Sequence, residues 1–379
     1  MKYMGSKRSM LKNGLGQLLI HQAQTAERFV DLFTGGGFVA WYIAENVNMP
    51  VLAVDLQEYA TTLAKAIICR TKILDPFALI TAWIQKAVDE RNGSKLWGEA
   101  ARLKYSGADI KEWVEKSRKL CKKPSEVGPI WNAYGGHYFS PSQALTFDFL
   151  ISRLPKDDPE KSVCLAACIS AATECVAAPG HTAQPFQPTE SASRFILEAW
   201  SRDPILYCQK ALETICPRHA RIAGHTITAD ALVVAQELNK QDLVFIDPPY
   251  SNVQYSRFYH VLETIARDQR QITVSGIGRY PPIKERPQSK FSNIGQSKKA
   301  LRDLLETLAS QGCNIIFTFP SGAASNGLSG DYIKQMANEW FCVEDHTTIE
   351  GRFSTLGGNN TKRDARKKSS EIILLMKPR

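Results

Sequence analysis

The segment DPPY at residues 247–250 combines groups that could hold a planar amine, and it directly follows the apolar run at residues 242–246. Its members are Asp247, Pro248, Pro249 and Tyr250. Proline donates no backbone hydrogen bond to a sheet ladder, so we expect a strand to end here. The Asp247 carboxylate and the Pro248 carbonyl offer two acceptors, and the Tyr250 ring offers a stacking face. Acceptors held in place help a weakly nucleophilic amine to attack, each contributing about 3 kcal/mol.

The alternative for DPPY alone is a strand-ending turn with an ordinary core aromatic. A second segment suited to ligand binding makes that alternative weaker. The strand-like run at residues 29–33 is followed by the glycines of residues 35–37, which permit a sharp turn and a close ligand approach. Asp55 ends the next strand-like run, about 20 residues later, where an acid commonly accepts hydrogen bonds from ribose hydroxyls. The two segments indicate an adenosine-like ligand, with a tight turn and a helix-capping acid as the open alternative.

An α/β sheet is the element that would position these groups. Seven β-rich segments are separated mostly by stretches with helical periodicity, and the unbroken apolar ones are typical of buried parallel strands. In such sheets ligands bind outside the carboxyl ends of the strands, so we expect the acids and the glycine turn to meet there. The segments are residues 29–33, 51–55, 225–230, 243–247, 314–319, 341–349 and 371–376.

The stretch between the second and third of these segments lacks strand patterns. It holds charged helical runs, an aromatic and glycine-rich part, and a helix of small residues around Cys168. It is too long to be a loop. We therefore expect a catalytic domain in two parts, residues 1–70 and 222–379, with residues 71–221 inserted as a mainly helical lobe.

Composition narrows the class of protein. The net charge of +9 favours a polyanionic partner, although charge alone is weak support. No apolar run reaches membrane-spanning length, and the first residues lack the apolar core of a signal peptide. Nine cysteines without a CxxC pair predict a reducing, cytoplasmic compartment and no metal site.

With these motifs the sequence resembles the Dam-like class of DNA N6-adenine methyltransferases. The resemblance rests on DPPY, on FVDLFTGGGF at residues 29–38 and on KYMGSKRSML at residues 2–11, in the family's order. It implies a Rossmann-like methyltransferase sheet of seven mostly parallel strands with the last pair antiparallel. It also implies S-adenosylmethionine as cofactor and duplex DNA as partner, with the target adenine flipped out of the helix. A partner restriction enzyme is compatible with it, and the oligomeric state stays undefined.

The resemblance also assigns residues to the cofactor. They are Tyr3, Lys7, Asp31, Phe33, Gly35, Gly37, Asp55, Asp230 and Asp247. Tyr3 and Lys7 match positions that line the pocket, although the family often has Trp in place of Tyr3. Asp31 and Phe33 stand where the family usually has Glu-Pro-Phe, and here Leu replaces the proline.

The other assignments follow the motif order. Gly35 and Gly37 match the turn beneath the methionine part of the cofactor, and Asp55 matches the acid that binds its ribose. Asp230 is the candidate for contact with its adenine. Asp247, Pro248 and Tyr250 match the positions that hold and stack the target base.

Two alternative functions stay open, a methyltransferase acting on adenine in RNA and a catalytically silent DNA-binding subunit. An N4-cytosine enzyme is disfavoured, because that chemistry more often presents serine in place of Asp247. Three basic segments could contact phosphate, although each alone is more often a solvated surface. They are Lys7, Arg8 and Lys12, then residues 279–290, and then Lys362, Arg363, Arg366, Lys367 and Lys368.

Overall fold

The computed structural model describes residues 7–107, 109–125, 127–267, 269, 271–346, 349–354 and 366–379. These residues form two units. The sheet unit holds residues 7–72 and His219–Tyr255, together with residues 287–379 as far as they are described. The helical unit holds Ile73–Arg218 and Ser256–Arg286.

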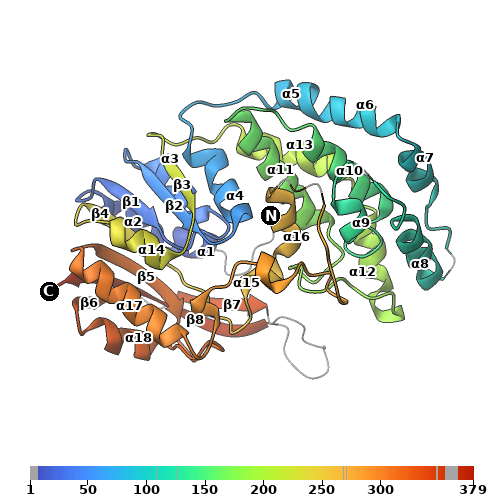
Figure 1. Ribbon diagram of the computed structural model, residues 1–379. Helices are drawn as coiled ribbons and strands as arrows, with labels where there is room; N and C mark the ends of the chain where they lie inside the picture. The colour runs from blue at the N-terminus through green and yellow to red at the C-terminus, as the bar shows by residue number, and fades with distance from the viewer. Residues whose placement is uncertain are drawn as a thin grey trace. The chain divides into compact units, whose positions relative to one another are not determined.

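The sheet unit is built on one sheet, which has eight strands within the described residues. Seven strands run in the order β3-β2-β1-β4-β5-β8-β6, and β7 also pairs with β8 (Figure 1). The five strands from β3 to β5 are parallel, and β8 is antiparallel to β5, β6 and β7. The strands are β1 (Arg28–Asp31), β2 (Val51–Asp55), β3 (His225–Thr228), β4 (Asp242–Ile246), β5 (Asn314–Pro320), β6 (Phe341–Asp345), β7 (Ile349–Ser354) and β8 (Arg366–Pro378).

The expected α/β fold is confirmed, with a mostly parallel sheet that ends in antiparallel pairs. Each of the seven expected segments overlaps a strand. The segment at residues 341–349 differs from expectation, because β6 ends at Asp345 and the separate strand β7 begins at Ile349. Both lie along β8, whose 13 residues are enough to pair with β6 in its second half and with β7 in its first.

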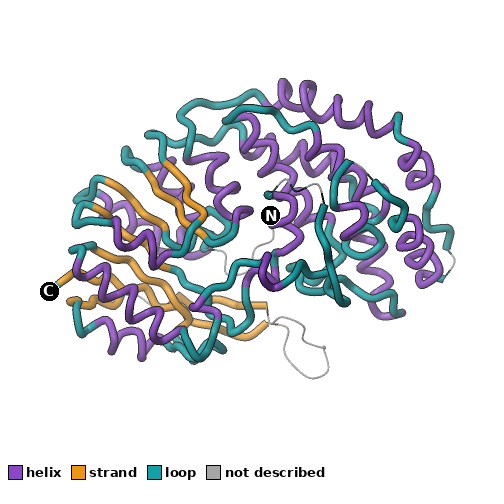
Figure 2. Tube along the Cα trace, viewed as in Figure 1, coloured by secondary structure: helices purple, strands orange, loops and turns teal. Residues whose placement is uncertain are grey.

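Helices cover both faces of this sheet (Figure 2). On one face, strand residues such as Val30 and Val244 form a continuous core with α14, α17 and α18. Helix α17 contributes Leu301, Leu304 and Leu308, whose spacing places them on one side of a helix. The opposite face packs against α3 and α4, which contact β1, β2 and β3. The helices of this unit are α1 (Arg8–Met10), η1 (Leu11–Leu15), α2 (Gly16–Ala23), α3 (Phe38–Asn46), α4 (Glu58–Ile68), α14 (Ala231–Val234), η3 (Ala235–Glu237), η5 (Lys290–Ser292), α17 (Ser297–Ser310) and α18 (Gly330–Ala337).

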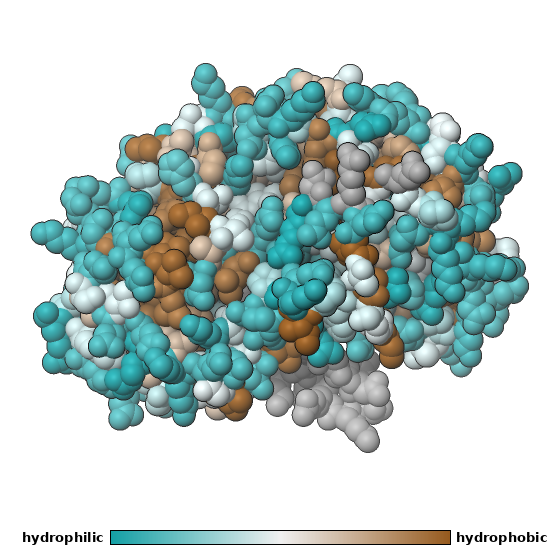
Figure 3. All heavy atoms as spheres, viewed as in Figure 1, coloured by the Kyte–Doolittle hydropathy of each residue, from teal (hydrophilic) through white to brown (hydrophobic). Residues whose placement is uncertain are grey.

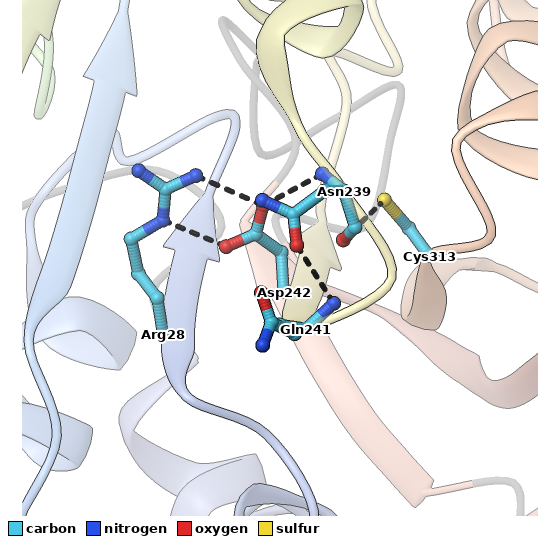
Figure 4. Close-up of polar contacts among 5 residues, drawn as sticks. All are labelled: Arg28, Asn239, Gln241, Asp242 and Cys313. Carbon is cyan, nitrogen blue, oxygen red and sulfur yellow. Dashed lines mark hydrogen bonds and ion pairs between the residues drawn. The ribbon is translucent and has the colours of Figure 1, made fainter.

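A bidentate ion pair locks the amino ends of β1 and β4 (Figure 4). Arg28 donates from Nε to Oδ1 of Asp242 at 2.7 Å and from Nη2 to Oδ2 at 2.9 Å. The backbone N–H of Asn239 donates to the same Oδ2 at 2.9 Å. Arg28 and Asp242 are also register partners in the parallel ladder. The pair therefore stabilises the register of β1 against β4.

The edge strand β3 is the most exposed strand of the parallel series. Figure 3 shows apolar side chains gathered over β3 and α14 on one face of the molecule. Two of the exposed apolar side chains there are Ile227 in β3 and Val233 in α14. An apolar surface thus lies next to the carboxyl end of β3.

The helical unit packs around α11, a helix of small residues that is buried along most of its length. Its thiols Cys164, Cys168 and Cys175 are free and buried, in agreement with the expected core helix. The other helices are α5 (Pro76–Leu79), η2 (Ile80–Gln85), α6 (Lys86–Asn92), α7 (Lys95–Arg102), α8 (Ile110–Leu120), α9 (Ile130–Tyr134), α10 (Pro141–Ser152), α12 (Glu190–Trp200), α13 (Pro204–Ile215), α16 (His260–Ala266) and η4 (Ile283–Glu285), with α11 at Glu160–Cys175. Helix α15 (Tyr255–Phe258) begins at the boundary between the units.

Residues 256–286 belong to the helical unit, whereas the sequence analysis places them with the second catalytic part. The reason is the burial of every residue of α16, which packs against α9 and α11. Among the described residues, no helix has both the length and the apolar composition needed to cross a membrane.

Candidate active site in the sheet unit

Three acids gather at the carboxyl edge of the parallel strands. Asp31 is the last residue of β1, Asp55 is the last residue of β2, and Asp247 directly follows β4. Strand β1 lies between β2 and β4, and Asp31 is in register with Ala53 on one side and Phe245 on the other. The structure thus brings residues from three distant parts of the chain to one edge of the sheet.

Asp247 is held through one of its two carboxylate oxygens. Its Oδ1 lies 2.9 Å from Nζ of Lys7 and accepts a hydrogen bond of 3.0 Å from the Thr318 hydroxyl. The second oxygen, Oδ2, keeps its capacity to accept hydrogen bonds from a ligand. Burial raises the pKa of Asp247 to about 6, although the positive charge of Lys7 lowers it. The negative charge of Glu371 raises it further.

Lys7 lies between two carboxylates. Its Nζ donates to Oε2 of Glu371 at 2.7 Å, besides contacting Asp247. The Lys7 side chain is 4% exposed and that of Glu371 is 10% exposed. Burial disfavours the ammonium, but the charges of Asp247 and Glu371 outweigh it and raise the pKa of Lys7 above its ordinary value. The result is a buried ion triad that carries one net negative charge and fixes the orientation of Asp247.

The buried position of Lys7 corrects its expected role as a phosphate contact. Its ammonium is enclosed by carboxylates and cannot face the solvent. Its neighbour Arg8 lies with Cζ 3.9 Å from the centroid of the Phe38 ring. Lys362 and Arg363 lie outside the described residues, and so does Tyr3.

The glycine turn after β1 is tied to Asp55. The Gly35 backbone N–H donates to Oδ2 of Asp55 at 2.9 Å, and the Gln57 N–H donates to Oδ1 at 2.9 Å. Burial raises the pKa of Asp55 to about 6, against the effect of these hydrogen bonds. Gly37 has a φ of 79°, and a Cβ there would lie 2.9 Å from Cε2 of Trp41. This position therefore needs glycine for both its conformation and its packing.

Asp31 and Phe33 border the same turn. Asp31 is buried, and the Phe33 backbone N–H donates to its Oδ1 at 3.3 Å. Burial raises the pKa of Asp31 well above its ordinary value, and the charges of Asp247 and Asp55 raise it further. The Phe33 ring meets the Phe291 ring edge to face, with 5.0 Å between centroids. The edge thus brings acidic groups close together beside aromatic surface.

Asn326 supports the DPPY corner through hydrogen bonds to backbone carbonyls. This fully buried side chain donates from Nδ2 to the Pro249 carbonyl at 2.7 Å and to the Phe291 carbonyl at 3.1 Å. Tyr250 packs against the sheet core, with its ring centroid 6.4 Å from that of Tyr255. Within the described residues, no donor reaches the Pro248 carbonyl, which is left as an acceptor.

Asp230 lies beyond β3 and caps α14, where its Oδ1 accepts a hydrogen bond of 2.9 Å from the Leu232 N–H. Capping the helix is therefore a sufficient structural reason for an acid at position 230, with no ligand needed. The other carboxylate oxygen of Asp230 keeps its capacity to accept a hydrogen bond. Among the described residues, no group of three acids, histidines or cysteines could hold a metal ion.

Three residues of this site are absent from the sequence-based assignment: Glu371, Thr318 and Asn326. Thr318 and Glu371 fall in segments expected to be strands, whereas Asn326 lies after the segment at residues 314–319. Thr318 is a polar residue inside the apolar strand β5, and Glu371 is an acid on β8 at the start of its apolar run. A polar residue on a strand predicted to be buried is the signal that would have pointed to Thr318 and Glu371.

Comparison with known proteins gives the family. Residues 3–93 and 207–309, slightly more than half of the chain, match the model of D12 class N6 adenine-specific DNA methyltransferases. The modification methylase StsI of Streptococcus sanguinis is 36% identical over 81 residues, which are 21% of this chain and 12% of that protein. The modification methylase LlaI of Lactococcus lactis subsp. lactis is 30% identical over 139 residues, which are 36% of this chain and 21% of that protein. The matched segments thus span a small part of either relative. On the family match, this chain belongs to the D12 class of N6 adenine-specific DNA methyltransferases.

Proposed function

We propose that this protein transfers a methyl group from S-adenosylmethionine to the N6 amine of adenine in a specific sequence of duplex DNA. The observation that supports this most directly is the meeting of the Asp55 turn and the DPPY corner at one sheet edge. The two bacterial relatives are named modification methylases, which supports a place in a restriction-modification system over an orphan methylase. Because genomic DNA is the proposed substrate, we place the protein in the cytoplasm.

The groups at the sheet edge fit S-adenosylmethionine, which supplies a methyl group bound to a positively charged sulfur. Both oxygens of Asp55 accept backbone hydrogen bonds and keep the capacity to accept one from a ribose hydroxyl. Because Asp31, Asp55 and Asp247 lie close enough to raise the pKa of Asp31, a cationic ligand beside them would favour their ionised forms. The exposed Val233, three residues after Asp230, offers apolar surface for an adenine ring.

The remaining cofactor assignments stay part of the proposal. Phe33, Gly35 and Gly37 shape the turn beneath the ligand, and Tyr3 is assigned by family position alone. For Lys7 we propose an indirect role, because its ammonium binds Asp247 and Glu371.

The DPPY corner would hold the flipped adenine. Oδ2 of Asp247 and the carbonyl of Pro248 each accept a hydrogen bond from one N–H of the amine, and the Tyr250 ring stacks on the base. The ionised Asp247 also stabilises the positive charge that develops on the amine nitrogen as it attacks. Pro249 has no ligand contact of its own in this scheme, since its carbonyl is engaged by Asn326. The helical unit, which holds Ile73–Arg218 and Ser256–Arg286, would recognise the DNA sequence around the target adenine. Most of it falls within the lobe expected at residues 71–221.

The test is methyl transfer from isotopically labelled S-adenosylmethionine to duplex DNA, single-stranded DNA and structured RNA, followed by nucleoside analysis. We expect N6-methyladenine in duplex DNA. Asp247→Ala should abolish transfer and leave DNA binding mostly intact, because the loss removes one acceptor for the flipped adenine and no contact with the DNA backbone. Asp303→Ala, which removes an exposed acid of the same unit, serves as the matched control. Transfer to RNA alone, or cofactor binding without transfer to any substrate, would overturn the proposal.

A further inference from the structure

The buried amide of Asn326 lies where three segments of the sheet unit meet. Its Nδ2 donates to the Pro249 carbonyl at 2.7 Å and to the Phe291 carbonyl at 3.1 Å. Its Oδ1 accepts a hydrogen bond of 3.3 Å from the Leu328 N–H. Two carbonyls and one N–H match one orientation of the amide, so the side chain cannot turn over without losing all three bonds.

The position of Asn326 is fixed by the chain around it. Its own carbonyl accepts a hydrogen bond of 2.6 Å from Oγ of Ser297, the first residue of α17, which is fully buried. The next residue, Gly327, has a φ of 87°, and a Cβ there would lie 3.0 Å from Cγ1 of Ile294. The direction of the Asn326 hydrogen bonds is therefore set by the fold, before any ligand binds.

The bond to Pro249 fixes one torsion of the DPPY corner. The proline ring sets φ, so ψ is the remaining free backbone torsion of Pro249. Rotation about ψ would turn the carbonyl that Asn326 holds. The same rotation would swing Tyr250 relative to the Pro248 carbonyl. Asn326 thus determines the angle between the acceptor proposed for the amine and the ring proposed to stack on the base.

The bond to Phe291 connects the same amide with the cofactor turn. The Phe291 side chain is 2% exposed, and its ring meets that of Phe33 edge to face, with 5.0 Å between centroids. Phe33 belongs to the turn proposed to lie beneath the methyl donor. One side chain therefore links the segment that would hold the target base with the segment that would hold the cofactor.

The chain beyond Tyr250 is anchored by other contacts. Nε2 of Gln254 donates to the Ser289 and Ser292 carbonyls at 2.9 and 3.1 Å. Oδ1 of Asn252 accepts a hydrogen bond of 2.8 Å from the Ile294 N–H. None of these bonds involves the Pro249 carbonyl. Loss of the Asn326 amide should therefore disturb the orientation at Pro249 and leave the rest of the loop attached.

We propose that Asn326 is a positioning residue for methyl transfer, which aligns the Pro248 carbonyl and the Tyr250 ring with the methyl donor. This inference rests on the proposed function and adds to it a residue that acts through the DPPY backbone. Transfer depends on the orientation of the reacting groups, and a displacement of about 1 Å can lower a rate about a hundredfold. Asn326 would thus act on the chemical step more than on the binding of either substrate.

The experiment compares two buried amides that make the same pattern of bonds. Gln143 of the helical unit donates from Nε2 to the Ala199 and Arg202 carbonyls at 2.8 and 2.7 Å, and its Oε1 accepts from the Ser140 N–H at 2.9 Å. Asn326→Leu and Gln143→Met each replace the amide with an apolar side chain of similar size. Both should lower the urea concentration at the midpoint of unfolding, because each leaves buried backbone groups unpaired.

The two variants should differ in catalysis. Once the methylated sequence is known from DNA of expressing cells, single-turnover methylation is measured at saturating cofactor and DNA. Asn326→Leu should lower this rate about a hundredfold, whereas Gln143→Met should leave it unchanged. Should Asn326→Leu fail to fold, Asn326→Asp carries the test, because it keeps the size of the side chain and removes both N–H donors. Its rate should fall at least about tenfold.

Two further measurements separate alignment from general damage. The Kd for S-adenosylmethionine, from calorimetric titration, should change less than about threefold in Asn326→Leu, because the lost contact acts on the chemical step. The acidic limb of its pH–rate profile should stay in place, because the hydrogen bonds of Asn326 reach backbone groups and the Ser297 hydroxyl and no carboxylate.

The two proposals fail in different ways. If the unmodified protein methylates no DNA, the proposed function and the role of Asn326 both fall. If it methylates DNA while Asn326→Leu is no slower than Gln143→Met, only the role of Asn326 falls. A rise in the cofactor Kd as large as the loss of rate, or a shift of the acidic limb, would also overturn that role.

Discussion

The ion triad of Lys7, Asp247 and Glu371 predicts opposite pH shifts for two substitutions. In the proposed mechanism methyl transfer requires Asp247 to be ionised, so the rate should fall as the pH drops through its pKa of about 6. Glu371→Gln removes a negative charge that raises this pKa, so the acidic limb should move to lower pH. Lys7→Met removes a positive charge that lowers it, so the limb should move to higher pH.

The size of each shift can be worked from the distances. Lys7 contacts Glu371 at 2.7 Å and Asp247 at 2.9 Å, so the two carboxylates lie near one another. Two unit charges roughly 5 Å apart interact by about 3 kcal/mol at an effective dielectric constant near 20. The ammonium between them screens this interaction, so we expect Glu371→Gln to move the limb by about one pH unit, or about 1.4 kcal/mol. Lys7→Met should give the larger shift, since its charge is in direct contact with Asp247.

Other groups near Asp247 must be kept constant in this comparison. They are Thr318, which donates to it, Asp31, whose pKa the charge of Asp247 raises, and Tyr250, whose pKa burial and the charge of Asp247 raise. Neither substitution changes them.

The assay is the rate of methyl transfer at saturating cofactor and DNA, measured between pH 5 and pH 8.5. Glu339→Gln is the matched control, because it makes the same replacement in an exposed ion pair with Arg302 of the sheet unit. Thermal unfolding identifies variants that fail to fold, and Glu371→Asp should restore the original limb. If Glu371→Gln left the acidic limb of the pH–rate profile unchanged or moved it to higher pH, the predicted effect of the Glu371 charge on the pKa of Asp247 would be refuted.

Two further predictions concern single acids. Asp55→Ala should raise the KM for S-adenosylmethionine at least about tenfold with a smaller change in kcat, because the loss of hydrogen bonds weakens binding before the chemical step; calorimetric titration of the cofactor checks it. Asp148→Ala should lower the free energy of unfolding in urea by about 2 kcal/mol, because the buried N–H groups of Ile130 and Trp131 lose their acceptor. A loss below about 0.5 kcal/mol would contradict the second prediction.

The elements that the sequence predicted well are those whose packing shows in local patterns. Strand β4 is a run of five residues that are all buried, and the proline pair marks its end. Helices α4 and α17 carry the periodicity expected of helices against a sheet. Strand β7 escaped prediction because its segment, IEGRFS, has a glycine and no regular alternation, and it exists as a strand through pairing with β8.

The candidate site was predictable only in part, for a physical reason. The acids at strand ends follow a rule that parallel sheets impose, so Asp31, Asp55 and Asp247 could be found from spacing. The contact between Lys7 and Glu371 joins residues 364 positions apart, and no local pattern shows such a pair. Asp230 illustrates the reverse, because its position at a strand end is also explained by a hydrogen bond that caps α14.

The raised pKa values of these acids connect ligand binding with proton release. Asp55 and Asp247 each have a pKa of about 6, so near pH 6 each carboxyl holds a proton for about half of the time. A cationic ligand bound beside them stabilises their ionised forms and lowers both pKa values. Binding of S-adenosylmethionine at pH 6 should therefore release protons, whereas at pH 8 the acids are already ionised and no release from them should occur.

Calorimetric titration in two buffers with different heats of ionisation measures this release directly. S-adenosylhomocysteine, which lacks the positive charge on sulfur, is the control, and it should release fewer protons at pH 6. Equal release with both ligands would show that the acids do not sense the charge on sulfur. Such a result would place the sulfur of the cofactor away from Asp31, Asp55 and Asp247. The proposed arrangement of methyl donor and target amine at this sheet edge would then be refuted.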